Sequence, residues 1–415
     1  PQHFVQGQTA SQLIIHHSKF NIPKMDAYIV AGYRTAVGRG KRSVLKTVRP
    51  DDMAADVIKH LVSQVDGFDP MRVDDLIVGN AVPEAEQGMQ VGRMLSLMAL
   101  PQNVSGMTVN RYCGSGIETV ALGVAKIKSG MAECIVAGGI ESMSLLPMMG
   151  HKVALNYKVA SEHPDWYLSM GITAEEVAKD YNITRADMDE FAYNSHQKAL
   201  NAISEGRFKD QIVPVTVEEI YVGADGQRMS NTRVIDTDEG PRGDTSIEVL
   251  NKLRPVFRNN GTVTAGNSSQ TSDGAAFTLI MSERMVKELG LKPIARLVGY
   301  ATEGIDPRIM GMGPIKAIPK VLKQTGMSLN DIEAIELNEA FASQSLGVIR
   351  ELGLDPSRVN VNGGAIALGH PLGCTGTKLS VQVIHEMRRT GQRYGMVTAC
   401  VGGGQGVAGI IERLD

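Results

Sequence analysis

The sequence places two thiols and one imidazole in short glycine-rich segments, where a side chain can meet a substrate. Cys113 is followed by Gly114, Ser115 and Gly116, where a helical pattern begins. A thiol at such a turn faces free backbone N–H groups and the positive end of the helix dipole, which should lower its pKa. We therefore predict that Cys113 is a nucleophile; the alternative is a small residue in a tight turn.

His370 and Cys400 are the second and third candidates. His370 lies in a loop between a glycine and a proline, which suits a catalytic histidine better than a core histidine. Cys400 precedes a glycine run at the end of a predicted strand, and we interpret its position as symmetric to that of Cys113. Glycine-rich turns are also purely structural in many α/β proteins. Cys134, inside an apolar strand, is predicted to be a buried structural thiol.

A polar pair, Asn338 and Glu339, follows the apolar stretch 332–337. Two polar residues at the end of a buried strand are unusual if packing is their only role. The alternative is a cap for the next helix. We keep Asn338 as a candidate site residue.

Composition excludes several classes of protein. Hydrophobic residues make up 43% and charged residues 21% of the 415 residues, as in ordinary globular proteins. A net charge of −3 gives no electrostatic case for nucleic acid. No run is apolar enough for a membrane span, and no His or Cys spacing indicates a metal. Four cysteines fit a reducing, cytoplasmic compartment better than a disulfide framework.

Short apolar runs alternate with amphipathic stretches in the first half. Strands are predicted at 27–33, 73–82, 108–113 and 132–144, and helices at 51–65 and 116–130. This alternation predicts a parallel sheet covered by helices.

The second half repeats the same plan. The stretches 293–304, 328–341, 359–376 and 394–406 echo the strands and turns of the first half, and a helix follows the third of them. The segment 143–271 does not fit the repeat and contains one predicted helix, around 173–204. We predict an N-terminal extension (1–24), a first half (25–142 with 272–293), a loop domain (143–271) and a second half (294–415).

Together these segments resemble the thiolase family. Residues 109–116, 338–342, 362–373 and 400–406 are similar to its four characteristic blocks, in order and at the family's spacing. The resemblance covers 26–415. It implies an α/β fold of five layers, αβαβα, built from two similar halves with an inserted loop domain that binds CoA.

The resemblance also implies a role for each site residue. His370 would take the proton from Cys113, whose thiolate attacks a 3-ketoacyl-CoA, and Cys400 would act as general acid and base. Asn338 would hold a water that stabilises one oxyanion together with His370, and the backbone N–H of Gly402 would stabilise the other with that of Cys113.

The resemblance further implies how CoA is held. Ser269 would contact its pantetheine arm and Arg242 its adenine; the alternative for each is a surface loop residue. CoA is then a substrate, and neither a permanently bound cofactor nor a metal is expected. A homodimer or homotetramer is expected, and a hydratase or dehydrogenase partner subunit is an open alternative.

The residues next to the site bear on the substrate. Ser169 stands before Met170, where biosynthetic acetoacetyl-CoA thiolases usually have a histidine, and 370–376 is similar to degradative members. Both favour thiolytic cleavage of 3-ketoacyl-CoA in fatty acid β-oxidation. The alternative is an acetoacetyl-CoA thiolase (acetyl-CoA acetyltransferase) running a Claisen condensation. The thiol of Cys400 argues against a ketosynthase-type condensing enzyme, and the presence of Cys113, His370 and Cys400 together argues against a non-catalytic relative.

Overall fold

A computed structural model describes residues 25–415, and the predicted extension 1–24 lies outside the described residues. Most of its strands form one continuous sheet with the main order β11-β12-β13-β10-β1-β9-β5-β3-β4. The first half supplies β1 (Ala27–Thr35), β3 (Asp75–Gly79), β4 (Ser105–Val109), β5 (Cys134–Ser142) and β9 (Ser272–Ser282). The second half supplies β10 (Ala295–Gly304), β11 (Ala334–Leu337), β12 (Tyr394–Val401) and β13 (Gln405–Arg413). The two halves of the sheet meet where β1 pairs with β10.

The prediction of a parallel sheet is only partly correct, because the sheet is mixed. Only β3 with its neighbours β4 and β5, β11 with β12, and β1 with the short β6 (Ile212–Val213) run parallel. Strand β9 lies antiparallel between β1 and β5, and β13 lies antiparallel between β12 and β10. The few residues between β12 and β13 can form only a hairpin, which forces that pair to be antiparallel.

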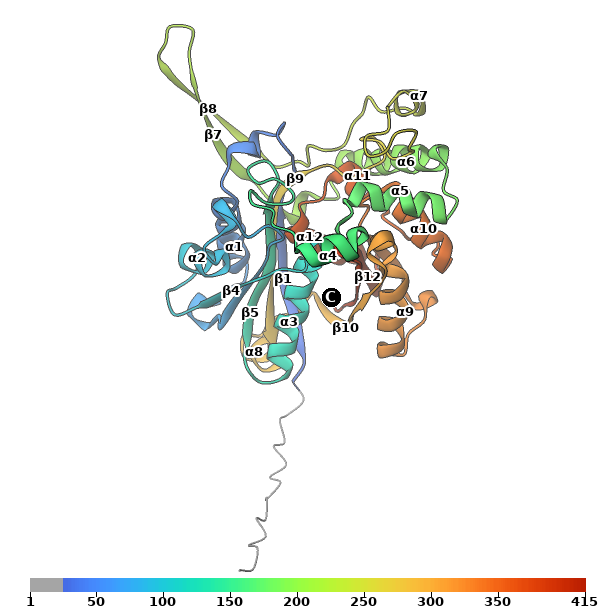
Figure 1. Ribbon diagram of the computed structural model, residues 1–415. Coiled ribbons are helices and arrows are strands. Elements are labelled where there is room, and N and C mark those ends of the chain that lie inside the picture. Colours follow the sequence, from blue (N-terminus) through green and yellow to red (C-terminus); the bar gives the residue numbers. More distant parts are fainter. Residues whose placement is uncertain (1–24) are drawn as a thin grey trace, which may run out of the picture.

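Six helices complete the layers around the sheet (Figure 1). Helices α1 (Pro50–Ser63) and α2 (Val91–Ala99) cover the outer face of the first half. Helices α9 (Pro314–Thr325) and α10 (Ala342–Leu352) cover the outer face of the second half. Helices α3 (Ser115–Lys128) and α12 (Leu372–Thr390) lie between the two halves of the sheet. The predicted five-layered αβαβα fold is therefore confirmed.

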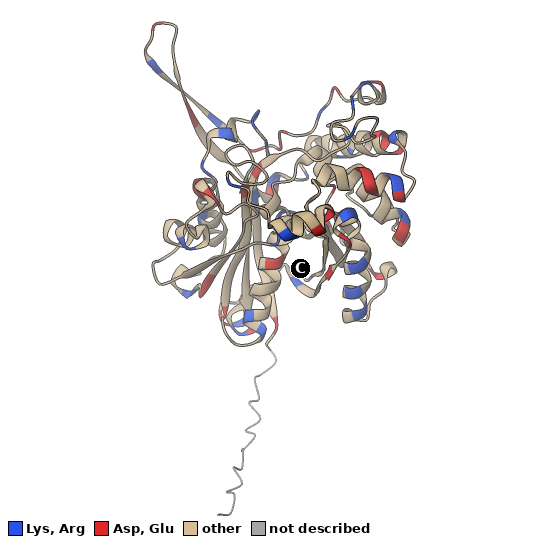
Figure 2. Cartoon of the chain, in the orientation of Figure 1, with Lys and Arg blue, Asp and Glu red and all other residues tan. Residues whose placement is uncertain are grey.

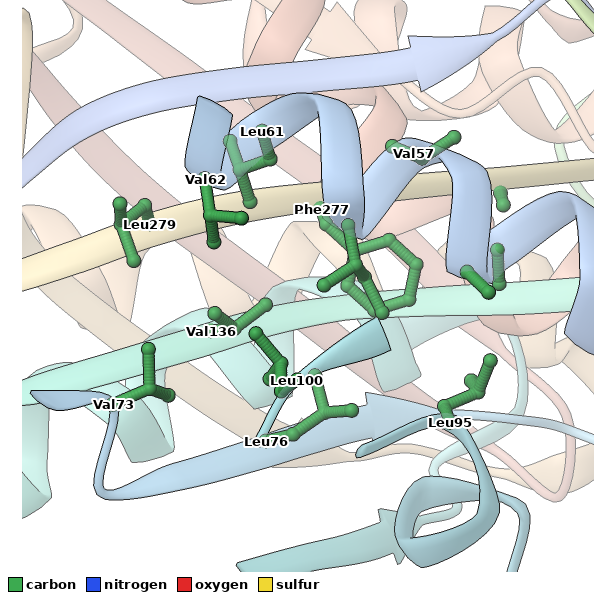
Figure 3. Close-up of a cluster of buried hydrophobic side chains, with 14 of the residues drawn as sticks. Val57, Leu61, Val62, Val73, Leu76, Leu95, Leu100, Val136, Phe277 and Leu279 are labelled. Atoms are coloured by element: carbon green, nitrogen blue, oxygen red, sulfur yellow. The ribbon is translucent and has the colours of Figure 1, made fainter. Parts of the chain in front are cut away.

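Alternating side chains explain why each half of the sheet is covered on both faces. In β5, Ile135 and Ala137 point toward α3 and α12, whereas Val136 points toward α1. Figure 3 shows Val136 with Phe277 of β9 and Val57 of α1 in the outer cluster. A strand buried on both faces reads as a continuous apolar run, as this one does.

The segment 143–271 adds mainly helices and one hairpin. It contains α4 (Tyr157–Glu162), α5 (Met170–Asp180), α6 (Arg185–Ser204), β7 (Val215–Val222), β8 (Arg228–Ile235) and α7 (Ile247–Asn251). The single helix predicted around 173–204 is wrong, because Asn182 has a positive φ of 51° and Thr184 caps a new helix. Figure 1 shows the β7–β8 hairpin projecting from the body.

Charged residues of both signs are spread over the face that Figure 2 shows. Most helices in that view carry both signs, whereas α9 carries lysines only. This distribution agrees with the small net charge of −3. No helix of residues 25–415 combines the length and the apolar character that crossing a membrane requires.

Candidate active site

The backbone before α3 presents Cys113 on a strained turn. Strand β4 ends at Val109, four residues earlier than the predicted strand, and Tyr112 to Gly114 form the 3-10 turn η4. Tyr112 has a φ of 43°, a left-handed conformation that is costly for a tyrosine. The hydroxyl of Ser115 stabilises it by accepting from the backbone N–H of Arg111 at 2.8 Å and donating to the carbonyl of Tyr112 at 2.7 Å. Cys113 is buried at this turn.

Two glycines allow the starts of α3 and α12 to touch. A Cβ atom at Gly116 would lie 2.5 Å from the backbone nitrogen of Thr377, and one at Gly376 would lie 2.2 Å from that of Ile117. Any side chain there would push the helices apart. The turn η4 consequently contacts both α12 and β12.

His370 precedes α12 as Cys113 precedes α3, each two residues before the first helical residue. Its Nδ1 lies 2.6 Å from the hydroxyl oxygen of Thr375, and that hydroxyl donates to the carbonyl of Pro371 at 2.9 Å. The hydroxyl hydrogen is thus used, so Nδ1 carries the ring proton and donates. Nε2 keeps a lone pair, and Asn338 Nδ2 lies 3.3 Å from it.

Burial keeps this imidazole neutral. The pKa of His370 falls to about 3, chiefly through burial and secondly through the nearby positive charge of Lys378. A neutral ring with a free Nε2 lone pair can act as a base.

The thiol of Cys113 does not have the lowered pKa that the sequence suggested. Burial raises its pKa to about 12. The backbone N–H groups of Gly402 and of Cys113 itself lower it but do not compensate, and the charge of Glu141 raises it further. Desolvation of the thiolate therefore outweighs the helix start, and the resting residue is a protonated thiol.

Cys400 is buried near the end of β12, and its pKa is raised by burial and then by Cys113. A negative charge on the Cys113 sulfur therefore disfavours ionisation of the Cys400 thiol. The predicted symmetry of these two thiols is wrong. Gly79 of β3 pairs with Gly139, and Leu337 of β11 pairs with Thr398.

Glu141 lies two residues after Gly139 in the first half. Cys400 lies two residues after Thr398 in the second half. Glu141 is thus the counterpart of Cys400, and His370 is the counterpart of Cys113.

Gly402 and Asn338 complete the site. A Cβ at Gly402 would make only ordinary contact with the Tyr112 ring, at 3.4 Å, and the left-handed residues of the turn are Gly403 and Gly404. Gly402 therefore contributes its N–H rather than its missing side chain. Asn338 is buried after β11, and its Oδ1 accepts no hydrogen bond from the described residues.

A cleft of about 600 Å³ contains both residues predicted to contact CoA. Ser269 and Arg242 line it. The other lining residues include the cations Arg39, Lys41 and Arg42 and the apolar side chains of Leu250, Leu253, Val256 and Phe257. Gln270, also in the lining, accepts at its carbonyl from the backbone N–H of His370 at 3.3 Å. The cleft lining therefore combines cations with apolar side chains and contacts the backbone of His370 through Gln270, but it does not include Cys113, His370 or Cys400 themselves.

Metal-ligating geometry is absent from the described part of the chain. No three His, Cys, Asp or Glu side chains of residues 25–415 gather in a way that could hold a metal ion.

Two family profiles match almost the whole described chain. The profile of the thiolase N-terminal domain matches residues 27–284, and that of the thiolase C-terminal domain matches residues 291–413. The chain belongs to the thiolase family. Its similarity to a 3-ketoacyl-CoA thiolase of Bacillus subtilis is 51% identity over 388 residues, covering 93% of this chain and 99% of that protein.

Other relatives of this thiolase carry a different name. An acetyl-CoA acetyltransferase of Pseudomonas aeruginosa is 45% identical over 401 residues, covering 94% of this chain and 99% of that protein. The crystal structure of the Bacillus anthracis acetyl-CoA acetyltransferase has a TM-score of 0.85 at 40% identity, covering 94% of this chain and 99% of that chain. This thiolase is accordingly an enzyme, an acyltransferase.

Several residues of this thiolase's site were not found in the sequence. The cations at 39, 41 and 42 form a visible run, GRGKR, that could have indicated an anion-binding entrance. Ser272, which holds the backbone of His370, gave no signal because the two residues become neighbours only on folding. Thr375, which contacts the ring, lies five residues after His370 and was overlooked although it is local in the sequence.

Proposed function

We propose that this thiolase cleaves 3-ketoacyl-CoA with CoA, giving acetyl-CoA and an acyl-CoA shortened by two carbons, through an acyl thioester on Cys113. The observation that carries the proposal is the surroundings of the Cys113 sulfur. It receives the N–H groups of Gly402 and of its own residue, and the Cys400 thiol lies near it. His370 stands at the start of the adjoining helix, with Nδ1 held by Thr375 and Nε2 lying 3.3 Å from Asn338 Nδ2.

The first half-reaction transfers the acyl group to sulfur. His370 takes the Cys113 proton as the sulfur attacks the 3-keto carbon. The N–H groups of Cys113 and Gly402 stabilise the oxyanion, each contributing ~3 kcal/mol. The bond between C2 and C3 then breaks and leaves the enolate of acetyl-CoA. Protonated His370 and a water bound by Asn338 stabilise the enolate oxygen while Cys400 protonates C2.

The second half-reaction restores every proton. The Cys400 thiolate takes the proton of an incoming CoA thiol, whose sulfur attacks the acyl group on Cys113. Cys113 leaves and recovers its proton from His370. No proton is exchanged with solvent, so both cysteines begin and end as thiols, which agrees with the raised pKa of each.

We assign CoA to the cleft lined by Ser269 and Arg242, and we assign residues 143–271 as the loop domain that supplies them. Arg39, Lys41 and Arg42 give the entrance positive charge suited to phosphate groups. The apolar lining near Phe257 suits the pantetheine arm. Arg242 pairs with Asp244 at 2.9 Å and is only half-buried, so it is free to turn toward a ligand.

We propose that the protein is a homo-oligomer, and the exposed edge of the sheet supports this proposal. Strand β4 is the last strand of the path, and its far edge pairs with no described strand. Exposed apolar side chains lie near that edge, including Met89, Met94, Leu97 and Tyr112. An apolar sheet edge of this kind suits pairing with a second copy.

The degradative direction rests on the relative named 3-ketoacyl-CoA thiolase and on Ser169 before α5. The second candidate, acetoacetyl-CoA thiolase, is supported by the two acetyltransferase relatives. Cleavage rates for the four-carbon substrate and for substrates of eight to sixteen carbons distinguish them. We expect turnover across the longer series. Activity confined to the four-carbon substrate would overturn the degradative assignment.

A further inference from the structure

Glu141 is a buried carboxylate that the reaction described above does not use. It occupies in β5 the place that Cys400 occupies in β12, and its side chain is 1% exposed. Cys113 and Gly373 lie beside it, one near its charge and the other hydrogen-bonded to it.

Every polar contact of this carboxylate is with an N–H donor. Its Oε2 accepts from the backbone of Ala81 at 2.9 Å and of Gly373 at 2.8 Å. Its Oε1 accepts from Gln87 Nε2 at 2.7 Å and Asn80 Nδ2 at 3.2 Å. Burial raises the pKa of Glu141, and the donors oppose this. A protonated carboxyl would present a hydrogen to one of these donors, so the ionised form fits the site.

The contact with Gly373 joins the two halves of the enzyme. Gly373 lies in the first turn of α12, three residues after His370. A Cβ there would lie 2.6 Å from the Cα of Asn80, so the helix start packs directly on the loop after β3. Glu141 comes from the half that carries the nucleophile, and Gly373 comes from the half that carries the base.

We propose that Glu141 is a positioning residue that holds the start of α12, and with it His370, against the turn that carries Cys113. A negative charge also suits the N-terminus of α12, whose backbone N–H groups are unpaired within the helix. The same charge also raises the pKa of Cys113, adding to the larger effect of burial. The role in turnover rests on the proposed function.

The test is Glu141→Gln, which keeps the shape and removes the charge. We expect kcat to fall roughly 10- to 100-fold through misplacement of His370, while KM for CoA changes less. Alkylation of Cys113 by iodoacetamide, followed by peptide mass spectrometry, should become about three- to tenfold faster at a fixed mildly alkaline pH, because the nearby charge is gone. Loosening of the turn alone would also accelerate alkylation of the buried thiol, but it would then do so in Glu141→Asp, which keeps the charge.

Glu175→Gln is the matched control. Glu175 is also a buried carboxylate that accepts backbone N–H groups, from Thr262 and Val263, but it is not among the charges acting on Cys113. Glu175→Gln should leave the rate of Cys113 alkylation unchanged. An equal acceleration in this variant would overturn the proposal, as would wild-type kcat or unaltered alkylation in Glu141→Gln.

Glu141→Asp decides the matter if the glutamine variant does not fold. It keeps the charge but shortens the reach to Gly373, so kcat should fall while alkylation stays at the wild-type rate. Wild-type kcat in this variant would overturn the proposal. Alkylation needs no substrate, so it tests the effect of Glu141 on Cys113 independently of the proposed function. Turnover of the wild-type protein tests the proposed function. Failure of the Glu141 proposal can therefore be distinguished from failure of the proposed function.

Discussion

The two halves of the molecule use one backbone plan for different chemistry. The units β3–α3–β5 and β11–α12–β12 each place three side chains at the same end of a parallel strand pair. In the first half these are Asn80, Cys113 and Glu141, and in the second half they are Asn338, His370 and Cys400. The fold thus supplies equivalent positions, and in the proposed mechanism their side chains divide the roles of nucleophile and base.

The two asparagines show how far the halves have diverged. Asn80 Nδ2 donates to the carbonyl of Ile140 at 3.3 Å and to Glu141, and it therefore fixes the strands. Asn338 Nδ2 instead lies 3.3 Å from the imidazole of His370. Asparagine therefore fixes the strands in the first half, whereas in the second half it lies against His370, the proposed base.

The largest expected effect separates Cys400 from a thiol that has only a packing role. Cys400→Ala should lower kcat by roughly 10²- to 10⁴-fold, because C2 then lacks its proton donor. Cys134, buried at the start of β5, belongs to the apolar core. Cys134→Ala should keep kcat and lower only the melting temperature. Equal loss of kcat in both variants would remove the distinction between the halves.

The next effect compares the two asparagines directly. Asn338→Ala should lower kcat roughly 100-fold, since one oxyanion loses its bound water. Asn80→Ala should leave a measurable kcat near that of the wild type and destabilise the fold by about 1–3 kcal/mol, because buried partners lose hydrogen bonds. Steady-state kinetics and urea unfolding give both quantities. The reverse pattern would show that the first half carries the oxyanion site.

The smallest effect concerns pH. A base acts when it is unprotonated, and His370 has a pKa of about 3 instead of its ordinary 6.5. We therefore expect kcat/KM to show no fall as pH decreases from about 8 through 6.5 to about 5, where an ordinary imidazole would become protonated. Circular dichroism at each pH checks that the enzyme stays folded. A midpoint near the ordinary value would mean that the ring is more solvated than the structure indicates.

Local sequence patterns were sufficient to single out the candidate site residues. Cys113, His370 and Cys400 stand beside glycines, and Asn338 follows an apolar strand, so each carries its signal within a few residues. The two similar halves followed from the repeated order of strands and helices, whereas the five layers followed only from the resemblance to the thiolase family. These features depend on short stretches of chain, whose periodicity the sequence displays directly.

Features that depend on distant packing could not be predicted. The pKa of Cys113 is set mainly by its burial among residues from distant stretches of the chain, such as Val82, Met143 and Leu372, which no local pattern records. Strand β9 is buried throughout but was not predicted as a strand between β1 and β5. The strand expected from 359 is reduced to one bridge between Val359 and Ile335, because the Asn360 side chain bonds the backbone N–H and carbonyl of Leu337 instead.

Mass spectrometry of the acyl-enzyme tests the division of labour most directly. The purified protein is incubated with a 3-ketoacyl-CoA in the absence of free CoA, quenched in acid and digested. The account predicts the shortened acyl group on the peptide that contains Cys113, and neither adduct nor turnover in Cys113→Ala. An acyl group on Cys400 or another residue, or turnover by Cys113→Ala, would contradict it.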